Sequence, residues 1–192
     1  YTLSLKQSLK AHVKYPNLKA VPMPVALALF DAATGEQLVL NSDSLFESGV
    51  KDGVYLFNQA EASIEFKDVK LKPVVSLLRN FSAPVDLEFN YSDQDLAFLL
   101  QHETNGFNQW QAAQTLLENI LLKDHNAQVY LDAISSPQLL PQLVNTDPLL
   151  ASRLLDVPSE GYLASRIDAD YNPVVIQAKR EALLNERLSQ TA

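Results

Sequence analysis

His102 and Glu103 form the pair of residues that comes nearest to a metal site in this sequence. In the zinc-binding pattern H-E-x-x-H, a second histidine four residues after the first projects from the same helix face. Position 106 is Gly106, so that second ligand is absent. We therefore interpret His102 as a histidine near a helix end, where the negative pole of the helix dipole favours it. His12 and His125 stand alone in the sequence, and we expect both at the surface.

An acidic run near the end of the chain begins like a calcium-binding loop. Asp168, Asp170 and Asn172 have the D-x-D-x-N spacing of such a loop. Pro173 and Val174 follow where the loop needs glycine, and no glutamate occupies its twelfth position. We interpret the run as the start of a helix.

No pattern for nucleophilic catalysis or phosphate binding is present. The chain has no cysteine and no G-x-S-x-G turn. Its five glycines form neither a phosphate-binding loop nor a dinucleotide-binding pattern; they are Gly35, Gly49, Gly53, Gly106 and Gly161. The carboxylates are plentiful, and we interpret them as helix caps and solvated helix faces.

Three aromatic residues, Phe98, Phe107 and Trp110, could form a platform for a ligand. At helical spacing such residues are more often part of a core, and we expect them there. The residues alone therefore predict no catalytic, cofactor-binding or metal-ligating side chain in this segment.

Composition narrows the class of protein. The chain has 192 residues, of which 47% are hydrophobic and 20% charged. This suits one domain or two small ones and is incompatible with intrinsic disorder. Of the net charge of −8, residues 92–192 carry −7, with six Lys and Arg against thirteen Asp and Glu. We therefore expect neither nucleic acid nor a membrane as a partner. The absence of cysteine fits a reducing compartment, and we expect the protein in the cytoplasm.

The first half of the chain, 1–91, has the texture of short antiparallel strands. Polar and apolar residues alternate in Thr2–Lys6, and the same period recurs from Val25 to Leu29. A turn containing Gly35 follows. We expect further strands at residues 37–40, 54–57, 62–66 and 84–90, the last with Val85, Leu87 and Phe89 on one face. Several short strands between turns predict a small β-sandwich domain over 1–91.

From residue 92 onward the period becomes helical. Ser92 is a candidate N-cap, and Asn105-Gly106 is expected to end one helix and begin the next. Asp147-Pro148 and Asn172-Pro173 have the cap-then-proline pattern of helix starts. These signals predict a helical domain over 92–192, built as a stack of antiparallel helices that resembles an α-solenoid. The fold class is thus β then α.

The last predicted helix is apolar on more than one side. Val174, Val175, Ala178 and Ala182 form one stripe, whereas Ile176, Leu183 and Leu184 point elsewhere. A helix of this kind is expected to have neighbours on two faces. Because the chain begins with tyrosine and stops after this helix, we expect it to be a segment of a longer protein in which the helical domain is truncated.

The junction between the halves resembles bacterial aminopeptidase N. The similarity is carried by the run Pro73–Val85, with Phe81–Val85 as its most specific part, and by Tyr91–Asp93, Leu96, Phe98, Leu99, His102, Phe107, Trp110 and Ala112–Gln114. The opening Tyr1–Lys6 is similar to the first strand of that family's β-sandwich. Asp170–Pro173, with Ile176 and Arg180–Leu183, resembles a helix start further along its helical domain. Residues 45–58 and 101–106 depart from the family's pattern.

This resemblance implies a zinc metallopeptidase of the gluzincin type that removes N-terminal residues from peptides. Its zinc is held by H-E-x-x-H and a downstream glutamate, and a Gly-x-Met-x-Asn loop grips the free amine. Neither motif occurs here, and the single methionine, Met23, lies between prolines. The resemblance therefore implies zinc in the longer protein and none in this segment. No catalytic residue of the family corresponds to a position in this sequence.

Three functions remain open at this point. In the first, the segment follows the catalytic domain of the same chain, spaces it and walls a chamber for peptide substrates. In the second, an immunoglobulin-like sandwich joined to a helical adaptor forms an independent protein-binding module. The third is an unrelated hydrolase whose site is assembled from residues distant in sequence.

Overall fold

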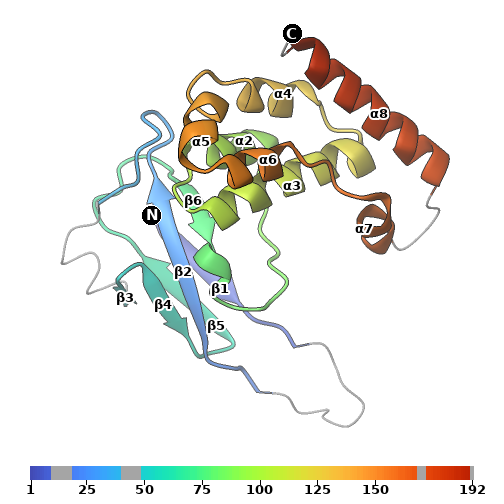
Figure 1. The fold of residues 1–192 in the computed structure, drawn as a ribbon. Coiled ribbons are helices and arrows are strands. Elements are labelled where there is room, and N and C mark those ends of the chain that lie inside the picture. Colours follow the sequence, from blue (N-terminus) through green and yellow to red (C-terminus); the bar gives the residue numbers. More distant parts are fainter. Residues whose placement is uncertain (10–18, 40–48, 168–171, 191–192) are drawn as a thin grey trace. The chain divides into compact units, whose positions relative to one another are not determined.

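The computed structural model of the chain describes residues 1–9, 19–39, 49–167 and 172–190. It divides into two compact units, Tyr1–Glu88 and Phe89–Ala192. The first unit is built of strands and the second of helices (Figure 1). Each unit is described by itself below. The predicted fold class, β followed by α, is confirmed.

The β unit consists of two antiparallel sheets. Its strands are β1 (Thr2–Lys6), β2 (Met23–Phe30), β3 (Val50–Lys51), β4 (Val54–Phe57), β5 (Glu61–Glu65) and β6 (Val74–Leu77). Strands β1 and β5 form one sheet, and the other has the order β3-β4-β2-β6. The expected strands at Thr2–Lys6, at Val25–Leu29 and at 54–57 are therefore found, and that at 62–66 begins one residue earlier and ends one residue earlier.

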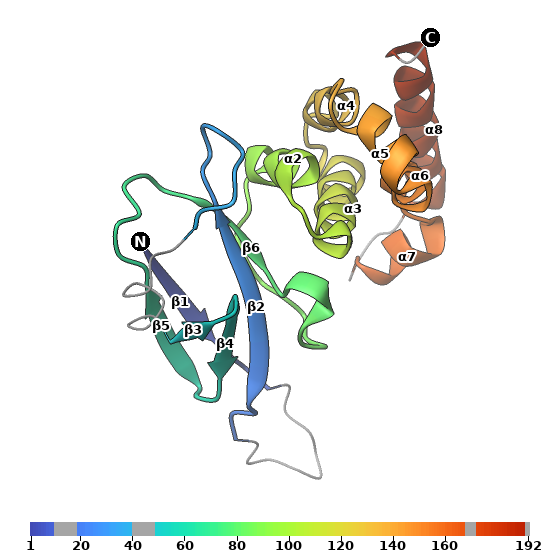
Figure 2. The ribbon, with the colours of Figure 1, turned by 60° about the vertical axis from the view of Figure 1, so that its left-hand side comes forward.

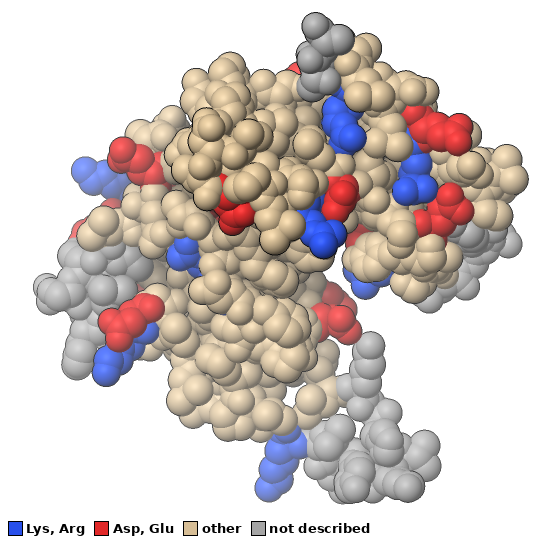
Figure 3. All heavy atoms as spheres, viewed as in Figure 1, with Lys and Arg blue, Asp and Glu red and all other residues tan. Residues whose placement is uncertain are grey.

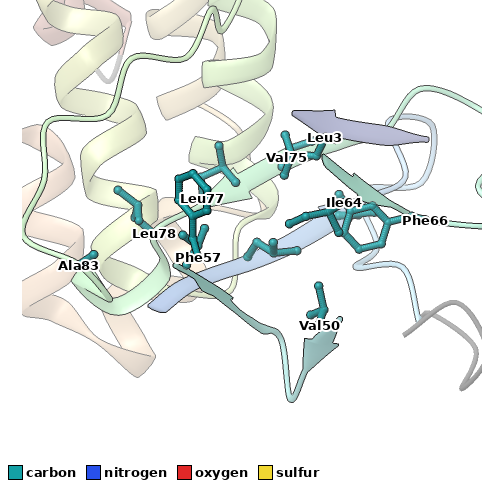
Figure 4. Packing of buried hydrophobic residues seen from close by; sticks show 12 residues of the cluster. Leu3, Val50, Phe57, Ile64, Phe66, Val75, Leu77, Leu78 and Ala83 are labelled. Carbon is teal, nitrogen blue, oxygen red and sulfur yellow. The ribbon is translucent and has the colours of Figure 1, made fainter. Parts of the chain in front are cut away.

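Both sheets contribute to one hydrophobic core. Leu3 of β1 pairs with Ile64 of β5, and both side chains are buried. Val75 and Leu77 of β6 belong to the same buried cluster, as Figure 4 shows. Because alternate residues of a strand face the same side, this register directs one face of each sheet inward and leaves polar residues such as Ser4 outside.

Strand β2 is one of the two inner strands of the larger sheet. Its first half, Met23–Ala26, pairs with β4, and its second half, Leu27–Phe30, pairs with β6. This division explains how the strand accommodates Pro24, because the proline lies in the half where β6 is not paired and no ladder donor is needed on that side. After Phe30 the chain turns. Gly35 takes φ of 77°, as the sequence predicts for that turn.

The prediction of a strand at residues 84–90 is wrong. That segment forms no strand, and its apolar residues Val85, Leu87 and Phe89 are exposed. The last strand is instead β6, whose sequence Val-Val-Ser-Leu is buried at every position. Alternation predicts half-buried strands, whereas a strand covered on both faces reads as a continuous apolar run. At the expected strand 37–40, only Gln37 forms an isolated bridge, to Phe30, and Leu40 lies outside the described residues.

The segment after β6 has an unusual backbone. A short 3₁₀ helix, η1 (Arg79–Phe81), follows Leu78. Leu78, Asn80 and Phe81 have positive φ values of 53°, 56° and 53°. For residues other than glycine such values are uncommon and cost conformational energy. The buried side chain of Leu78 and the Ser82 hydroxyl, which accepts the Ala26 N–H at 3.0 Å, hold the segment in place.

The helical unit contains seven α-helices within the described residues. They are α2 (Asp93–His102), α3 (Gly106–Lys123), α4 (Gln128–Ile134), α5 (Leu140–Thr146), α6 (Pro148–Leu155), α7 (Glu160–Ser165) and α8 (Pro173–Gln190). Short connections link them, and α2 packs against α3, α5 against α6 and α7 against α8 (Figure 2). Helices α4, α5 and α7 are short and were not predicted individually.

Caps fix where the longer helices begin. Ser92 and Asp95 form a capping box at the start of α2, in which each side chain accepts the other residue's backbone N–H. Asn105 accepts the N–H of Asn108 at the start of α3. Asp147 caps α6 in the same way, and Asn172 accepts two N–H groups of α8. The helix starts predicted from the sequence are thus found at all four positions.

The buried side of α8 differs from the predicted stripe. Ile176 and Leu183 are 6% and 4% exposed, whereas Val174 and Val175 are 73% and 46% exposed. Polar contacts of α8 explain which of its sides is buried. Lys179 donates to the backbone carbonyl of Leu121 at 3.2 Å, and Arg187 donates to that of Leu155. These carbonyls lie at the C-terminal ends of α3 and α6, where the helix dipole attracts a cation.

Replacing Ser92 by alanine tests the capping box. The variant loses the hydroxyl that accepts the Asp95 N–H at 3.1 Å. We expect the free energy of unfolding of the helical unit to fall by about 1 kcal/mol, as is typical for the loss of such a cap. Urea unfolding followed by far-ultraviolet circular dichroism measures it. As a control, Ser189→Ala near the end of α8 should cost less than about 0.5 kcal/mol, and equal losses in both variants would contradict the prediction.

Candidate functional site

The pair His102 and Glu103 ends α2 and does not form a metal site. The ring of His102 packs on Phe98, with 4.6 Å between ring centroids. Glu103 is 4% exposed, and its Oε1 accepts the N–H groups of Thr104 at 2.7 Å and Asn105 at 2.8 Å. The carboxylate therefore holds the loop between α2 and α3. This agrees with the helix-end interpretation of His102.

His125 has a partner that the sequence did not indicate. Its Nδ1 lies 2.7 Å from Oδ2 of Asp93, and Asp93 also accepts the side-chain amide of Asn119 at 3.1 Å. Lys123 in turn donates to Asn119 at 2.9 Å. His125 is exposed, as expected, but it joins the start of α2 to the end of α3 rather than standing alone. The remaining candidates, His12, Asp168 and Asp170, lie outside the described residues.

The described residues do not fit the zinc ion that the family resemblance implies for the longer protein. Within residues 1–9, 19–39, 49–167 and 172–190, no three His, Asp or Glu side chains lie close enough together to hold a metal. The glutamate of the partial motif, Glu103, is engaged by backbone N–H groups. No reaction step is therefore assigned to this segment.

A groove between α3, α6 and α7 is the best candidate for a binding site. It has a volume of about 780 Å³, within the range typical of small-molecule and peptide sites. Its lining includes Phe107, Trp110, Leu149, Leu150, Pro158 and Tyr162. The groove lies wholly within the helical unit.

The aromatic residues Phe107 and Trp110 lie in this groove and not in the core. Their rings are 5.9 Å apart, and both side chains are only partly buried. The expectation of core positions is therefore wrong for this pair. Positions 107, 110 and 114 recur every three or four residues and share one side of α3. Further along the helix the same side carries Leu117, which is fully buried, so only the N-terminal part of this side is open to the groove. Phe98, also partly buried, packs on His102 instead.

Helix α6 supplies the opposite wall. Leu149 is 67% exposed there, and Leu150 contacts the start of α3. A Cβ added to Gly106 would lie 3.0 Å from Cδ2 of Leu150, so the two helices approach closely at this glycine. Gln114 donates to the backbone carbonyl of Asp156 at 2.9 Å and joins α3 to the segment after α6. The sequence signalled the start of α6 but not that its exposed leucine would face two aromatic rings.

Charged groups occur at the margins of the groove. Arg153 and Asp156 form an ion pair of 3.1 Å, and both side chains are exposed. Asp147 caps α6 by accepting the Leu150 N–H at 2.9 Å, and among the described residues it pairs with no cation. The lining therefore has two carboxylates against one guanidinium. Figure 3 shows the wider pattern on one face of the molecule, where scattered acidic and basic side chains are surrounded by uncharged atoms.

Tyr162 closes one side of the groove as a neutral hydrogen-bond donor. Its hydroxyl donates to Oε1 of Glu118, whose carboxylate also pairs with Arg166 at 3.5 Å. Burial, and then the hydrogen bond to Glu118, raise the pKa of Tyr162 to about 12. The phenol is thus uncharged at neutral pH, and it ties α7 to α3.

A second hollow lies in the β unit, with a volume of about 570 Å³. Its lining combines exposed Val39 and Leu71 with three lysines and two aspartates from the loops after β2 and β5. These lysines are surface residues on loops, and exposed surface lysines alone do not define a ligand.

Comparison with known proteins assigns both units. An Ig-like sandwich followed by stacked helices defines the class of this chain, and each half matches a family model of that description. Residues 1–90 match a domain of unknown function with an Ig-like fold (DUF3458), and residues 93–191 match its C-terminal companion of ARM repeats. The chain belongs to this family.

The relatives are bacterial aminopeptidases. Aminopeptidase N of Escherichia coli is 31% identical over 201 residues, which cover all of this chain and 22% of that protein. Aminopeptidase N of Caulobacter vibrioides is 31% identical over 68% of this chain and 15% of its own length. The chain therefore spans about a fifth or less of these curated relatives. The resemblance to the aminopeptidase N family is confirmed over the whole chain.

A solved structure has the same fold. The crystal structure of Legionella pneumophila aminopeptidase A in complex with aspartic acid matches 99% of this chain with a TM-score of 0.67 and 26% sequence identity. The match covers 21% of that protein. Among the described residues of the present chain, no helix is both long and apolar enough to cross a bilayer.

The pKa of His102 provides a test of how side chains pack at the end of α2. Burial lowers the pKa of His102 below its usual value of 6.5, so the fold favours the neutral ring. The unfolded chain then binds more protons than the folded one just below pH 6.5, and this group reduces stability as the pH falls through that window. Replacing Phe98 by alanine uncovers the part of the ring that packs on Phe98, and we expect the pKa of His102 to rise toward 6.5.

An NMR titration of the His102 ring protons measures this shift. Val144→Ala on exposed α5 is the control and should leave the titration unchanged. A midpoint that stays in place or falls in the Phe98→Ala variant would show that Phe98 does not shield the ring from water.

Proposed function

We propose that this chain is a non-catalytic segment of a zinc-dependent aminopeptidase N that removes N-terminal residues from peptides. The observation that carries the proposal is the match of the whole chain to about a fifth of aminopeptidase N of Escherichia coli. The residues here offer no zinc-binding motif, and the nearest one is broken at Gly106. The chemistry therefore belongs to a catalytic domain elsewhere in the same longer chain.

In this proposal the β unit is a spacer. A core built from both sheets makes the unit compact, and its buried cluster includes Phe57, Ile64 and Phe66. Such a core resists deformation, because interiors packed at crystal-like density transmit displacement rather than absorb it. The unit would therefore keep a fixed distance between its neighbours in the longer chain.

The helical unit is proposed to form part of the wall around the peptide-binding chamber. Stacked helices of the ARM type build extended surfaces from repeated pairs. This half of the sequence carries a net charge of −7. An acidic wall would favour the entry of cationic peptides through its long-range field.

Metal analysis and an activity assay test the proposal directly. The 192-residue chain is expected to hold no stoichiometric zinc after loading and extensive dialysis, and to release no product from an aminoacyl-anilide, because the ligands of the metal are not in it. Aminopeptidase N of Escherichia coli, treated in parallel, is the positive control. Zinc at one equivalent or measurable turnover by the chain alone would overturn the proposal.

The charge of the wall has its own test in the full-length protein. Exposed carboxylates of the helical unit, Asp132, Glu181 and Glu186, are replaced by the corresponding amides. We expect kcat/KM for a cationic peptide to depend less steeply on ionic strength, because fewer charges remain to be screened. Glu36→Gln with Glu65→Gln in the β unit is the control. An unchanged slope in the helical variant would remove the electrostatic role.

A further inference from the structure

The groove between α3, α6 and α7 combines an apolar floor with large exposed side chains. Phe107 and Trp110 form one wall, and Leu149, 67% exposed, stands on the other. Tyr162 is 44% exposed at the end formed by α7. Partly or largely exposed aromatic and aliphatic side chains bury apolar surface when a ligand enters, and this favours binding.

The charged residues of the groove favour some apolar ligands over others. Arg153 is already paired with Asp156, whereas Asp147 has no cationic partner among the residues described. The carboxylate of Asp147 lies at the start of α6, two residues before Leu149. A ligand with a cation next to its apolar groups would therefore complement this margin better than an anionic one.

The dimensions suit a short peptide. A volume of about 780 Å³ accepts two or three side chains together with their backbone. The groove is also held open by contacts outside its floor, since Gln114 bonds the carbonyl of Asp156 and Tyr162 bonds Glu118. A site whose walls are fixed in this way loses little conformational entropy when it binds.

We propose that this groove binds a segment of peptide that carries an apolar side chain beside a lysine or arginine. The inference rests on the proposed function, in that it takes peptides as the ligand class of the protein and places one of their contacts on the helical unit. The apolar side chain lies between Trp110 and Leu149, and the cation lies at Asp147.

Trp110 provides the measurement, because it is the only tryptophan in the chain. The probe is the blocked peptide acetyl-Leu-Phe-Arg-amide, titrated into the 192-residue chain while tryptophan emission is recorded. We expect a saturable shift in emission, and weaker binding of acetyl-Leu-Phe-Glu-amide. Blocked ends remove the free amine, so binding is measured without any contribution from an aminopeptidase centre.

Matched variants locate the site. Leu149→Ser removes an exposed contact without opening the core, and we expect the affinity for the arginine peptide to fall roughly tenfold. Asp147→Asn keeps the helix cap and removes the charge, so we expect a loss of about threefold and a weaker dependence on salt. Leu188→Ser, at a similarly exposed leucine outside the groove, should bind like the parent chain.

Several outcomes would overturn the inference. They are an emission that does not respond to any peptide, equal binding by the Leu149→Ser and Leu188→Ser variants, and an emission that depends on protein concentration alone, which would indicate a second copy in the groove. Failure of the proposed function is separate. Zinc binding or turnover by the chain would overturn that function whatever the peptide titration shows, whereas absent peptide binding without zinc or turnover overturns only this inference.

Discussion

Helix α3 is the element against which most of the helical unit packs, since α2, α4, α6 and α8 all contact it. Leu116, Leu117 and Leu121 are fully buried, and each such leucine contributes about 1.5–3 kcal/mol by leaving water. The buried positions of α3 also include the amides Asn108, Gln109 and Asn119. The N-terminal part of the side that carries Phe107 and Trp110 is covered only at its edges by α6 and α7. The groove is thus the part of α3 that its neighbours leave open.

Polar contacts with helix ends decide how the last helix packs. Lys179 contacts the Leu121 carbonyl and the Asp124 carboxylate, and Arg187 contacts the Leu155 carbonyl. Arg180 pairs with Glu160 of α7 at 3.2 Å. These cations share one side of α8 with Ile176 and Leu183. When the cations bind their partners on α3, α6 and α7, that side of α8 therefore faces the other helices. The small apolar residues on the other side stay exposed for the same reason.

The sequence predicted what depends on local chemistry. The caps at Ser92 and Asp147 are local, because a side chain two or three residues away satisfies the first N–H groups of the helix. Elements defined by distant partners were missed. Strand β6 lacks polar-apolar alternation because both of its faces are covered, and the exposed segment at 84–90 alternates but forms no strand. The groove was missed for the same reason, since side chains from different helices, such as Leu149 and Trp110, line it together.

The contacts that hold the groove in shape lie apart from the apolar surface that would contact a ligand. Gly106 allows α6 to approach α3, and the bond from Gln114 to the Asp156 carbonyl fixes the segment that follows. The bond from Tyr162 to Glu118 holds α7, and it persists at neutral pH because the phenol ionises only at about pH 12. Each tie lies at a margin, so the apolar floor needs no rearrangement to accept a side chain. The groove is in this way a preformed surface, and under the proposed function its part would be to position a peptide chain.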